Sequence, residues 1–177
     1  VDSISYVSTS FKNKWIDKYA PSVNATFIPL GFDTKRWYGI ESDNSKSSKT
    51  KLVYIGYLQS QFSLENIISC VNDRSDFELH IIGDGDKRSE YESMSGANVI
   101  FHGNKSLDVA ANLVSSCDVG VLPILGNAQM PNKFFDYIGA SIPILSIGMT
   151  DSSLYIEDHD IGWLSSFDNE SINLSLD

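Results

Sequence analysis

Short apolar runs alternate along the chain with longer segments in which apolar residues recur every three or four positions. The short runs are rich in β-branched and aromatic residues, which is typical of buried strands. The longer segments have the spacing of amphipathic helices. The pattern predicts strands at residues 4–8, 25–29, 52–56, 77–82, 97–103, 118–123, 142–145 and 162–164. It predicts helices at residues 11–19, 63–72, 87–94, 107–116, 131–138 and 152–158, and a last helix capped by Asp168.

The order of these elements predicts the fold class. Strand and helix alternate at least five times with loops of a few residues, so right-handed crossovers would give a parallel sheet with helices on both faces. We therefore expect an α/β, Rossmann-like, doubly wound domain over residues 1–177. Residues 41–51 are rich in Ser and Lys and contain no apolar anchor, which predicts an exposed loop.

The net charge of the chain limits which kinds of molecule it can bind. The chain has 13 basic and 23 acidic residues and a net charge of −10, which argues against binding to nucleic acid or to an anionic lipid surface. No apolar run approaches the roughly 20 residues of a transmembrane helix, and the first residues do not resemble a signal peptide. We expect a soluble, cytoplasmic domain. Because it begins without methionine, we expect it to be a piece of a longer protein.

The two cysteines, Cys70 and Cys117, fall in a helical pattern and beside a buried strand, without a CxxC spacing. This arrangement is typical of small core residues in a reducing compartment. We expect neither a disulfide nor a metal site.

Glycines stand where several predicted strands end, at Gly56, Gly83, Gly85 and Gly103. In an open α/β sheet, ligands bind in the crevice outside the carboxyl ends of the strands. Each of these glycines would allow the backbone to approach a ligand closely, and a tight strand-to-helix turn is the alternative explanation. A dinucleotide fingerprint is excluded, because position 88 is Arg88 where a third glycine is required.

The stretch 126–145 is the strongest candidate for a site, since a polar loop leads into a predicted helix and then into a buried strand. Pro131 suits the first turn of that helix. A lysine in the first turn, Lys133, would suit phosphate oxygens, and Asp136 one turn later could accept hydrogen bonds from ribose hydroxyls. The alternative is an ordinary solvated helix face with an i, i+3 ion pair.

Other chemistry is less well supported. The chain has no Gly-x-Ser-x-Gly elbow, and no pair of carboxylates has a spacing that singles out a general acid and base. We therefore assign no catalytic residue. His80 and His159 are expected to be structural, whereas His102 is expected at a strand end that borders the crevice.

Taken in order, these blocks resemble the carboxy-terminal, donor-binding domain of a GT-B glycosyltransferase, in particular the group 1 (family 4-like) enzymes. The matching blocks are residues 54–56, 81–85, 98–103, 117–123 and 131–145. The resemblance implies a nucleotide-diphosphate sugar as donor substrate, with no further cofactor. It also implies an amino-terminal acceptor domain outside residues 1–177.

The resemblance implies a role for each candidate residue. The base would lie near the turns after two strands, the diphosphate at the start of the helix with Lys133, and the ribose at Asp136. The implied donor-binding residues are Gly56, Gly83, Asp84, Gly85, His102, Gly103, Asn104, Met130, Pro131, Asn132, Lys133 and Asp136.

Two departures from the family pattern leave alternatives open. The first member of the family's acidic pair falls on Ala128, and the usual basic pair becomes Tyr57 and either Gln61 or Phe62. The base, the sugar, the acceptor and the stereochemical outcome therefore stay undetermined. We expect transfer in cell-surface polysaccharide or glycolipid synthesis. A non-catalytic nucleotide-binding or scaffolding module and a GT-B sugar epimerase are the alternatives, and peripheral membrane association is left open for the full-length enzyme.

Overall fold

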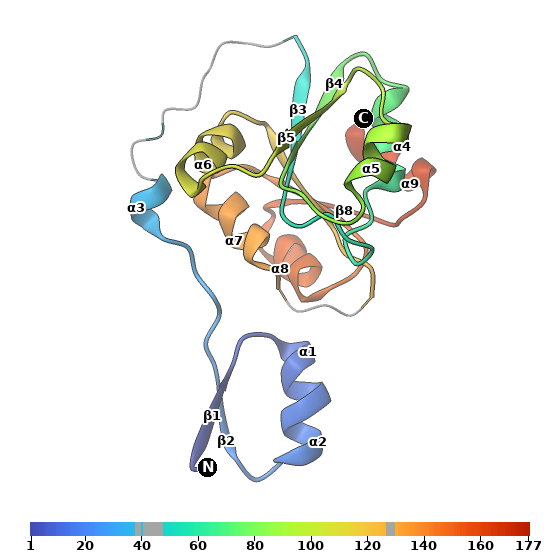
Figure 1. Ribbon diagram of the computed structural model, residues 1–177. Helices are drawn as coiled ribbons and strands as arrows, with labels where there is room; N and C mark the ends of the chain where they lie inside the picture. The colour runs from blue at the N-terminus through green and yellow to red at the C-terminus, as the bar shows by residue number, and fades with distance from the viewer. Residues whose placement is uncertain (38–39, 41–47, 127–129) are drawn as a thin grey trace.

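The computed structural model describes residues 1–37, 40, 48–126 and 130–177. Within this part, six strands form a parallel sheet in the order β5-β4-β3-β6-β7-β8 (Figure 1). The strands are β3(Thr50–Ile55), β4(Phe77–Ile82), β5(Val99–Gly103), β6(Val119–Pro123), β7(Ile144–Ile147) and β8(Gly162–Ser165). The order reverses between β3 and β6, which is where an open α/β sheet has its binding crevice.

Helices cover both faces of this sheet. On one face the core gathers residues of α4(Glu65–Asn72), α5(Arg88–Met94) and α9(Asn169–Leu176). On the other it gathers residues of α6(Leu107–Ser115), α7(Asn132–Gly139) and α8(Asp151–His159). In α4, for example, Ile67, Ile68 and Val71 are fully buried, as the helical spacing of apolar residues requires. The predicted doubly wound fold is confirmed.

The first residues form a separate small sheet. Strands β1(Ser3–Tyr6) and β2(Asn24–Phe27) pair in parallel, and they are joined by the helical segments α1(Thr9–Phe11), η1(Lys12–Ile16) and α2(Asp17–Tyr19). In Figure 1 this unit lies below the main sheet and is linked to it through α3(Thr34–Trp37). Ser10 ties the two parts together, since its N–H and hydroxyl both donate to the Asp151 carboxylate. A single donor-binding domain over residues 1–177 stays a prediction.

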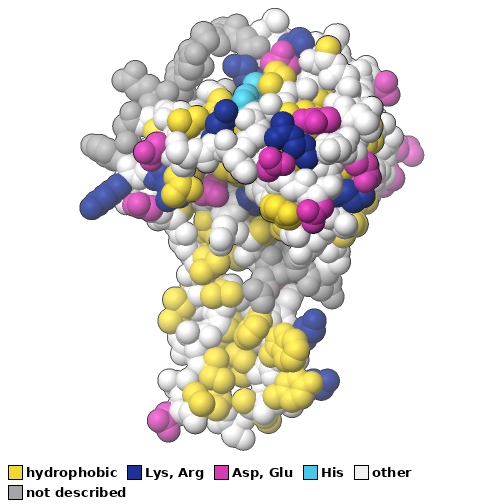
Figure 2. Space-filling view, viewed as in Figure 1, with side chains coloured by type: hydrophobic (Ala, Val, Ile, Leu, Met, Phe, Trp, Pro, Cys, Tyr) yellow, Lys and Arg dark blue, Asp and Glu magenta, His cyan; other side chains and the backbone are white. Residues whose placement is uncertain are grey.

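Apolar side chains gather on the surface of this N-terminal unit, as Figure 2 shows. The large exposed ones are Trp15, Tyr19, Phe27, Ile28, Leu30 and Phe32. An exposed apolar patch of this kind is rare on a complete soluble domain and marks a contact surface. A two-stranded parallel sheet is also seldom stable alone, because parallel sheets are normally covered on both faces.

Several element boundaries differ from the predicted ones. Thr50 and Lys51, expected in a loop, begin β3, because their N–H groups donate to the Asp76 carbonyl and the Asp118 carboxylate. Most of that loop, residues 41–47, lies outside the described residues. Pro131 is the N-cap of α7 with an extended ψ of 157°, not its first residue.

Two further differences concern α3 and the end of α7. The short helix α3 was not predicted, and the helix that was expected to end before Gly139 includes it. The two meet in the structure: the Trp37 ring of α3 packs on Gly139, where a Cβ atom would lie 2.6 Å from the ring.

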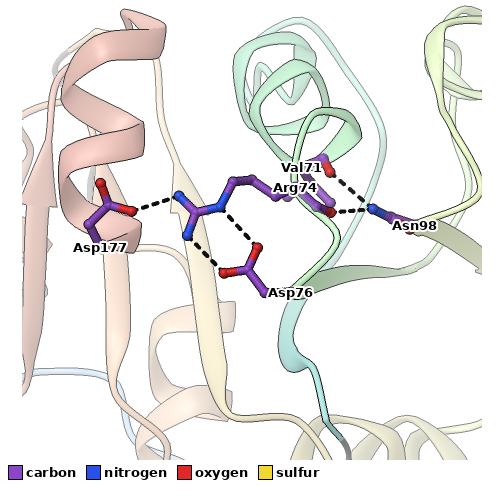
Figure 3. A network of polar contacts seen from close by, with 5 residues as sticks. All are labelled: Val71, Arg74, Asp76, Asn98 and Asp177. Atoms are coloured by element: carbon purple, nitrogen blue, oxygen red, sulfur yellow. Dashed lines mark hydrogen bonds and ion pairs between the residues drawn. The ribbon is translucent and has the colours of Figure 1, made fainter.

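The amino-terminal edge of the sheet is closed by a polar network (Figure 3). The Arg74 guanidinium donates to Asp76 from Nε and Nη2, at 3.0 and 2.9 Å, and from Nη1 to Asp177 at 2.7 Å. The Asn98 amide donates to the carbonyls of Val71 and Arg74. This network ties α9 and the loops before β4 and β5 together, at the edge opposite the carboxyl ends of the strands.

Candidate functional site

The turns after β3 and β4 bond through their backbones to each other and to the last residues of β4 and β5. The Gly56 N–H donates to the Ile82 carbonyl at 2.9 Å, and the Gly83 N–H donates to the Gly103 carbonyl at 3.0 Å. The Leu58 N–H donates to the Asp84 carbonyl at 2.9 Å. The hydrogen-bond ladder of the sheet therefore continues beyond the strand ends. We call the hydrogen-bonded backbone of residues 56–58, 82–85 and 103 the floor of the carboxyl edge.

Gly83 and Gly85 allow the backbones of these neighbouring turns to pack closely. Their φ angles are 134° and 159°, and a Cβ atom would lie 2.0 Å from the Gly56 carbonyl oxygen at Gly83 and 2.3 Å from that of Leu58 at Gly85. Such contacts are far too short for any side chain. The close approach at these two glycines is thus to the backbone of the neighbouring turn, and a ligand contact at Gly83 or Gly85 stays a prediction.

Helix α7 is fixed against this floor by Tyr137. Its hydroxyl shares its one hydrogen between the carbonyls of Val53 and Val121, at 3.2 and 3.0 Å, and accepts from the Ile55 N–H at 3.3 Å. The ring fits because β6 has Gly120 beneath it, where a Cβ atom would lie 2.4 Å from the ring. One side chain therefore couples α7 to both central strands, one helical turn beyond Lys133.

Lys133 reaches the centre of the carboxyl edge. Its side chain is 6 % exposed, and its Nζ donates to the Tyr54 hydroxyl at 2.9 Å. A Cβ atom at Gly56 would lie 3.0 Å from this Nζ. The ammonium nitrogen also lies 4.1 Å from the centre of the Tyr54 ring and 3.3 Å from that of Phe62. The solvated-face interpretation is therefore wrong for Lys133.

This environment sets the charge of Lys133. Burial lowers its pKa from the usual 10.5 to about 7, and the nearby Asp136 carboxylate opposes the shift. Near neutral pH the side chain is then divided between ammonium and amine. A bound anion would favour the ammonium form.

Asp136 lies half-buried one turn after Lys133. Burial raises the pKa of its carboxyl group, and the positive charges of Arg36 and Lys133 lower it. Arg36 belongs to α3, so the carboxylate has a neighbour in the segment that leads to the N-terminal unit. The structure thus brings Lys133 and Asp136 together.

Replacing Gly56 by alanine is expected to lower the free energy of unfolding by about 1–3 kcal/mol. The φ angle of Gly56 is 144°, and the added Cβ would press on Lys133 at 3.0 Å. Urea unfolding measures the loss. Gly126→Ala is the control for backbone strain alone, because Gly126 has a φ of 79° but no atom within 4 Å of its Cβ position. An equal loss of unfolding free energy in the two variants would mean that the contact between the added Cβ atom and Lys133 does not destabilise the protein.

His102 is engaged by a second histidine. Its Nε2 lies 3.0 Å from Nδ1 of His80, and Nε2 of His80 lies 3.5 Å from the Glu78 carboxylate. Burial lowers the pKa of both imidazoles. If His80 directs its Nε2 proton toward Glu78, then His102 donates to His80, and its Nδ1 carries the free lone pair.

Asp84 lies in the turn after β4 and contacts Gly85 and Arg88. Oδ1 of Asp84 accepts from the Gly85 N–H at 2.9 Å, and Oδ2 lies 3.2 Å from Nη1 of Arg88. Arg88 also bonds to Glu92 at 2.8 Å and lies 3.2 Å from the Cβ position of Gly103. Arg88 is thus a second cation near the edge, close to the turn after β5.

The start of α7 supplies the remaining candidates. Met130 is buried, Pro131 is half-buried and Asn132 is exposed. Since Pro131 has no N–H, the free amide groups of the first turn begin at Asn132. Asn104 is exposed after β5. Ala128, the position of the missing acidic residue, lies outside the described residues.

Sequence reasoning missed Tyr54, Phe62 and Arg88 as parts of this edge. Phe62 is one of two alternatives, with Gln61, for the second basic residue of the resembled family, and its ring here faces the ammonium group of Lys133. The sequence could have indicated this role of Phe62, because an aromatic residue there replaces an expected cation. Arg88 was noted only as the residue that breaks a glycine pattern.

Over the described residues, no group of three or more His, Cys, Asp and Glu side chains could hold a metal ion. In the same residues, no helix has the length and apolar character to cross a membrane.

Solved structures resemble the chain over nearly its whole length. Sucrose-phosphate synthase from Thermosynechococcus elongatus matches with a TM-score of 0.79 at 14 % identity, covering 99 % of this chain and 48 % of that one. Anabaena Alr3699/HepE, in complex with UDP, gives 0.82 at 12 % identity, with 99 % and 53 % covered. WaaG, a glycosyltransferase involved in lipopolysaccharide biosynthesis, gives 0.77 at 19 % identity, with 97 % and 52 % covered.

At these identities the likeness shows the fold alone, and the chain spans about half the length of these proteins. Comparison with curated protein sequences gives no match. The family model described as "Glycosyl transferases group 1" matches residues 49–172, well over half of the sequence, and the chain therefore belongs to that family.

Proposed function

We propose that the chain binds the nucleoside-diphosphate sugar donor of a glycosyltransferase along the carboxyl edge of β3, β4 and β5. The observation that carries the proposal is the position of the Lys133 ammonium group beside Gly56, at the centre of that edge. A cation and the free amide groups of a helix start suit a diphosphate. In a chain with a net charge of −10, such a local site is what an anionic ligand requires.

In this proposal the roles of the other residues follow from their places. Asp136 accepts hydrogen bonds from the ribose. The base is bordered by Asp84 in the turn after β4, by His102 near the end of β5 and by Asn104 after it. Catalysis consists of stabilising the leaving diphosphate and positioning the acceptor. The proposal needs no metal or further cofactor, because Lys133 and the α7 amides supply the positive charge.

The whole protein is proposed to transfer the sugar in cell-surface polysaccharide or glycolipid synthesis, from the cytoplasm. The support is family membership together with the involvement of WaaG in lipopolysaccharide biosynthesis and the UDP in complex with Alr3699/HepE. An amino-terminal acceptor domain is proposed to cover the exposed apolar surface of residues 1–33. The solved relatives are about twice as long as this chain, which leaves room for such a domain.

A nucleotide panel tests the proposal. UDP, GDP, ADP and TDP are each added at millimolar concentration, and the thermal midpoint of unfolding is recorded. A ligand that binds the native state must raise the midpoint, and the nucleotide with the largest shift identifies the base. If none of the four raises it, the donor site is refuted and the non-catalytic alternative is favoured.

Asp136→Asn is expected to weaken binding of the selected nucleoside diphosphate by about tenfold, since one hydrogen bond to a charged group is lost. Isothermal calorimetry measures the affinity. The matched ligand is the 2′,3′-dideoxy form, whose affinity should be equal for both proteins because it lacks the ribose hydroxyls. Unchanged affinity for the parent nucleotide would mean that Asp136 does not contact the ribose and interacts with Arg36 instead.

A further inference from the structure

The Tyr54 hydroxyl stands between Lys133 and the backbone of the turn after β3. Tyr54 is fully buried, and its O–H donates to the Tyr57 carbonyl at 2.9 Å. The Lys133 Nζ lies 2.9 Å from the same hydroxyl oxygen. A phenol has a single hydrogen to donate. Because that hydrogen is given to Tyr57, the Tyr54 oxygen can only accept from Lys133.

An oxygen that only accepts favours the charged form of a lysine. An ammonium group is a stronger donor than a neutral amine, so the bond to Tyr54 stabilises the protonated state. The rings of Tyr54 and Phe62, 4.1 and 3.3 Å from Nζ, act in the same direction. These contacts oppose the effect of burial, which favours the neutral amine.

In the described part of the chain, other titratable groups act on this pair from three helices, and the buried Tyr137 of α7 also interacts with Tyr54. From α7, the Asp136 carboxylate favours the ammonium form of Lys133, and Arg36 on α3 faces Asp136 in turn. From α5, Tyr91 acts on Tyr54, whose own pKa is raised by burial. Tyr54 therefore stays a neutral phenol at any pH at which the protein would be assayed.

We infer that Tyr54 is a positioning residue of the diphosphate site, which favours the protonated form of Lys133 and fixes its ammonium group beside Gly56. The inference rests on the proposed function. Tyr54 would not touch the ligand, because it is fully buried, and would act through Lys133. Its effect on binding should therefore depend on pH in a way that a purely structural tyrosine would not.

Tyr54→Phe is the variant that tests this. It keeps the ring and removes the accepting oxygen, so the pKa of Lys133 should fall by about one unit, the value of one hydrogen bond. The affinity for UDP is measured by calorimetry at pH 5.5 and pH 8.0 for both proteins. We expect the ratio of wild-type to variant affinity to be about tenfold larger at pH 8.0, because the variant has then lost the ammonium group more completely. Ionisation of UDP itself cancels in this ratio.

Tyr91→Phe is the matched control. The Tyr91 hydroxyl is buried in the same core and bonds to the Phe62 carbonyl and the Leu64 N–H. Its loss should lower the thermal midpoint in the same way but leave the affinity ratio equal at the two pH values. If Tyr54→Phe also gives a ratio that does not change with pH, Tyr54 has only a structural role and the inference is overturned.

A measurement without nucleotide separates this inference from the proposed function. The ¹³Cε resonance of Lys133, assigned by its absence in Lys133→Met, reports the pKa of the side chain in the ligand-free protein. A lower pKa in Tyr54→Phe supports the inference, and an equal pKa in both proteins refutes it. Failure of wild-type protein to bind UDP, GDP, ADP or TDP would instead refute the donor site and leave this result standing.

Discussion

Replacing Lys133 by methionine is expected to raise the free energy of unfolding at neutral and acidic pH, by an amount on the order of 2–4 kcal/mol. The pKa of Lys133 is lowered by burial from 10.5 to about 7, so the folded protein holds this proton less tightly than the unfolded chain does. Methionine has a similar volume and no charge to desolvate. The Tyr54 hydroxyl keeps its bond to Tyr57 in the variant, so no buried donor is left without a partner.

The sign of the pH dependence follows from the same shift. Below about pH 7 both states are protonated, and the cost of burying the ammonium group is present in full. Between about 7 and 10.5 the unfolded chain binds a proton that the folded protein lacks, so stability rises with pH. Above 10.5 the cost has disappeared. Urea unfolding at pH 6 and pH 10 should show this gain in the wild type and not in Lys133→Met.

Lys105→Met is the control, because Lys105 is exposed and its loss should leave stability nearly unchanged. A Lys133→Met variant that is less stable than the wild type at both pH values would contradict the argument. It would mean that the contacts of the Lys133 ammonium group with the Tyr54 and Phe62 rings stabilise the folded state by more than the loss of its hydration destabilises it.

The order of strands and helices was readable from the sequence because each buried element has a strong local period. The strand of residues 50–55 illustrates the limit. Its apolar part was predicted, but Thr50 and Lys51 join it only because Asp76 and Asp118, distant in the chain, accept their N–H groups. Polar residues at a strand start carry no local signal for such a partner.

The N-terminal unit shows a second limit. Both of its strands were predicted from local pattern, yet β1 pairs with β2 and not with the main sheet. Residues 28–37 lead the chain away from this small sheet to α3, whose Trp37 ring packs on Gly139. Neither property is encoded in the period of a strand.

For the candidate site, the sequence placed Lys133 in the first turn of a helix at the correct edge of the sheet. It did not predict that the side chain is buried, because this depends on contacts across 79 positions to Tyr54. The space for it exists because Gly56 has no side chain and Phe62 supplies an apolar wall. The helical position was local information, whereas the charge state was set by tertiary packing.

The burial of Lys133 bears directly on ligand binding. Lys133→Met should weaken UDP binding on the order of 50-fold, within the range for a hydrogen bond to a charged group, while affinity for uridine should stay the same. Only the diphosphate presents oxygens to the ammonium group, and the methionine side chain preserves the shape of the floor beside Gly56. Calorimetry with both ligands on both proteins measures the effect. An equal loss for UDP and uridine would mean that Lys133 supports the pocket without contacting phosphate.

The pH profile of the wild type provides a second check on the same contact. Because the ligand needs the ammonium form and the pKa of free Lys133 is about 7, UDP affinity should be higher at pH 7 than at alkaline pH. Above pH 7, affinity should fall by up to tenfold per unit as the ligand has to bring a proton onto the amine. Lys133→Met has no such proton to gain, so its weak affinity should not vary between pH 7.5 and 9. A wild-type affinity that is equally constant over that range would show that Lys133 stays charged without a ligand, or that the diphosphate lies elsewhere on the edge.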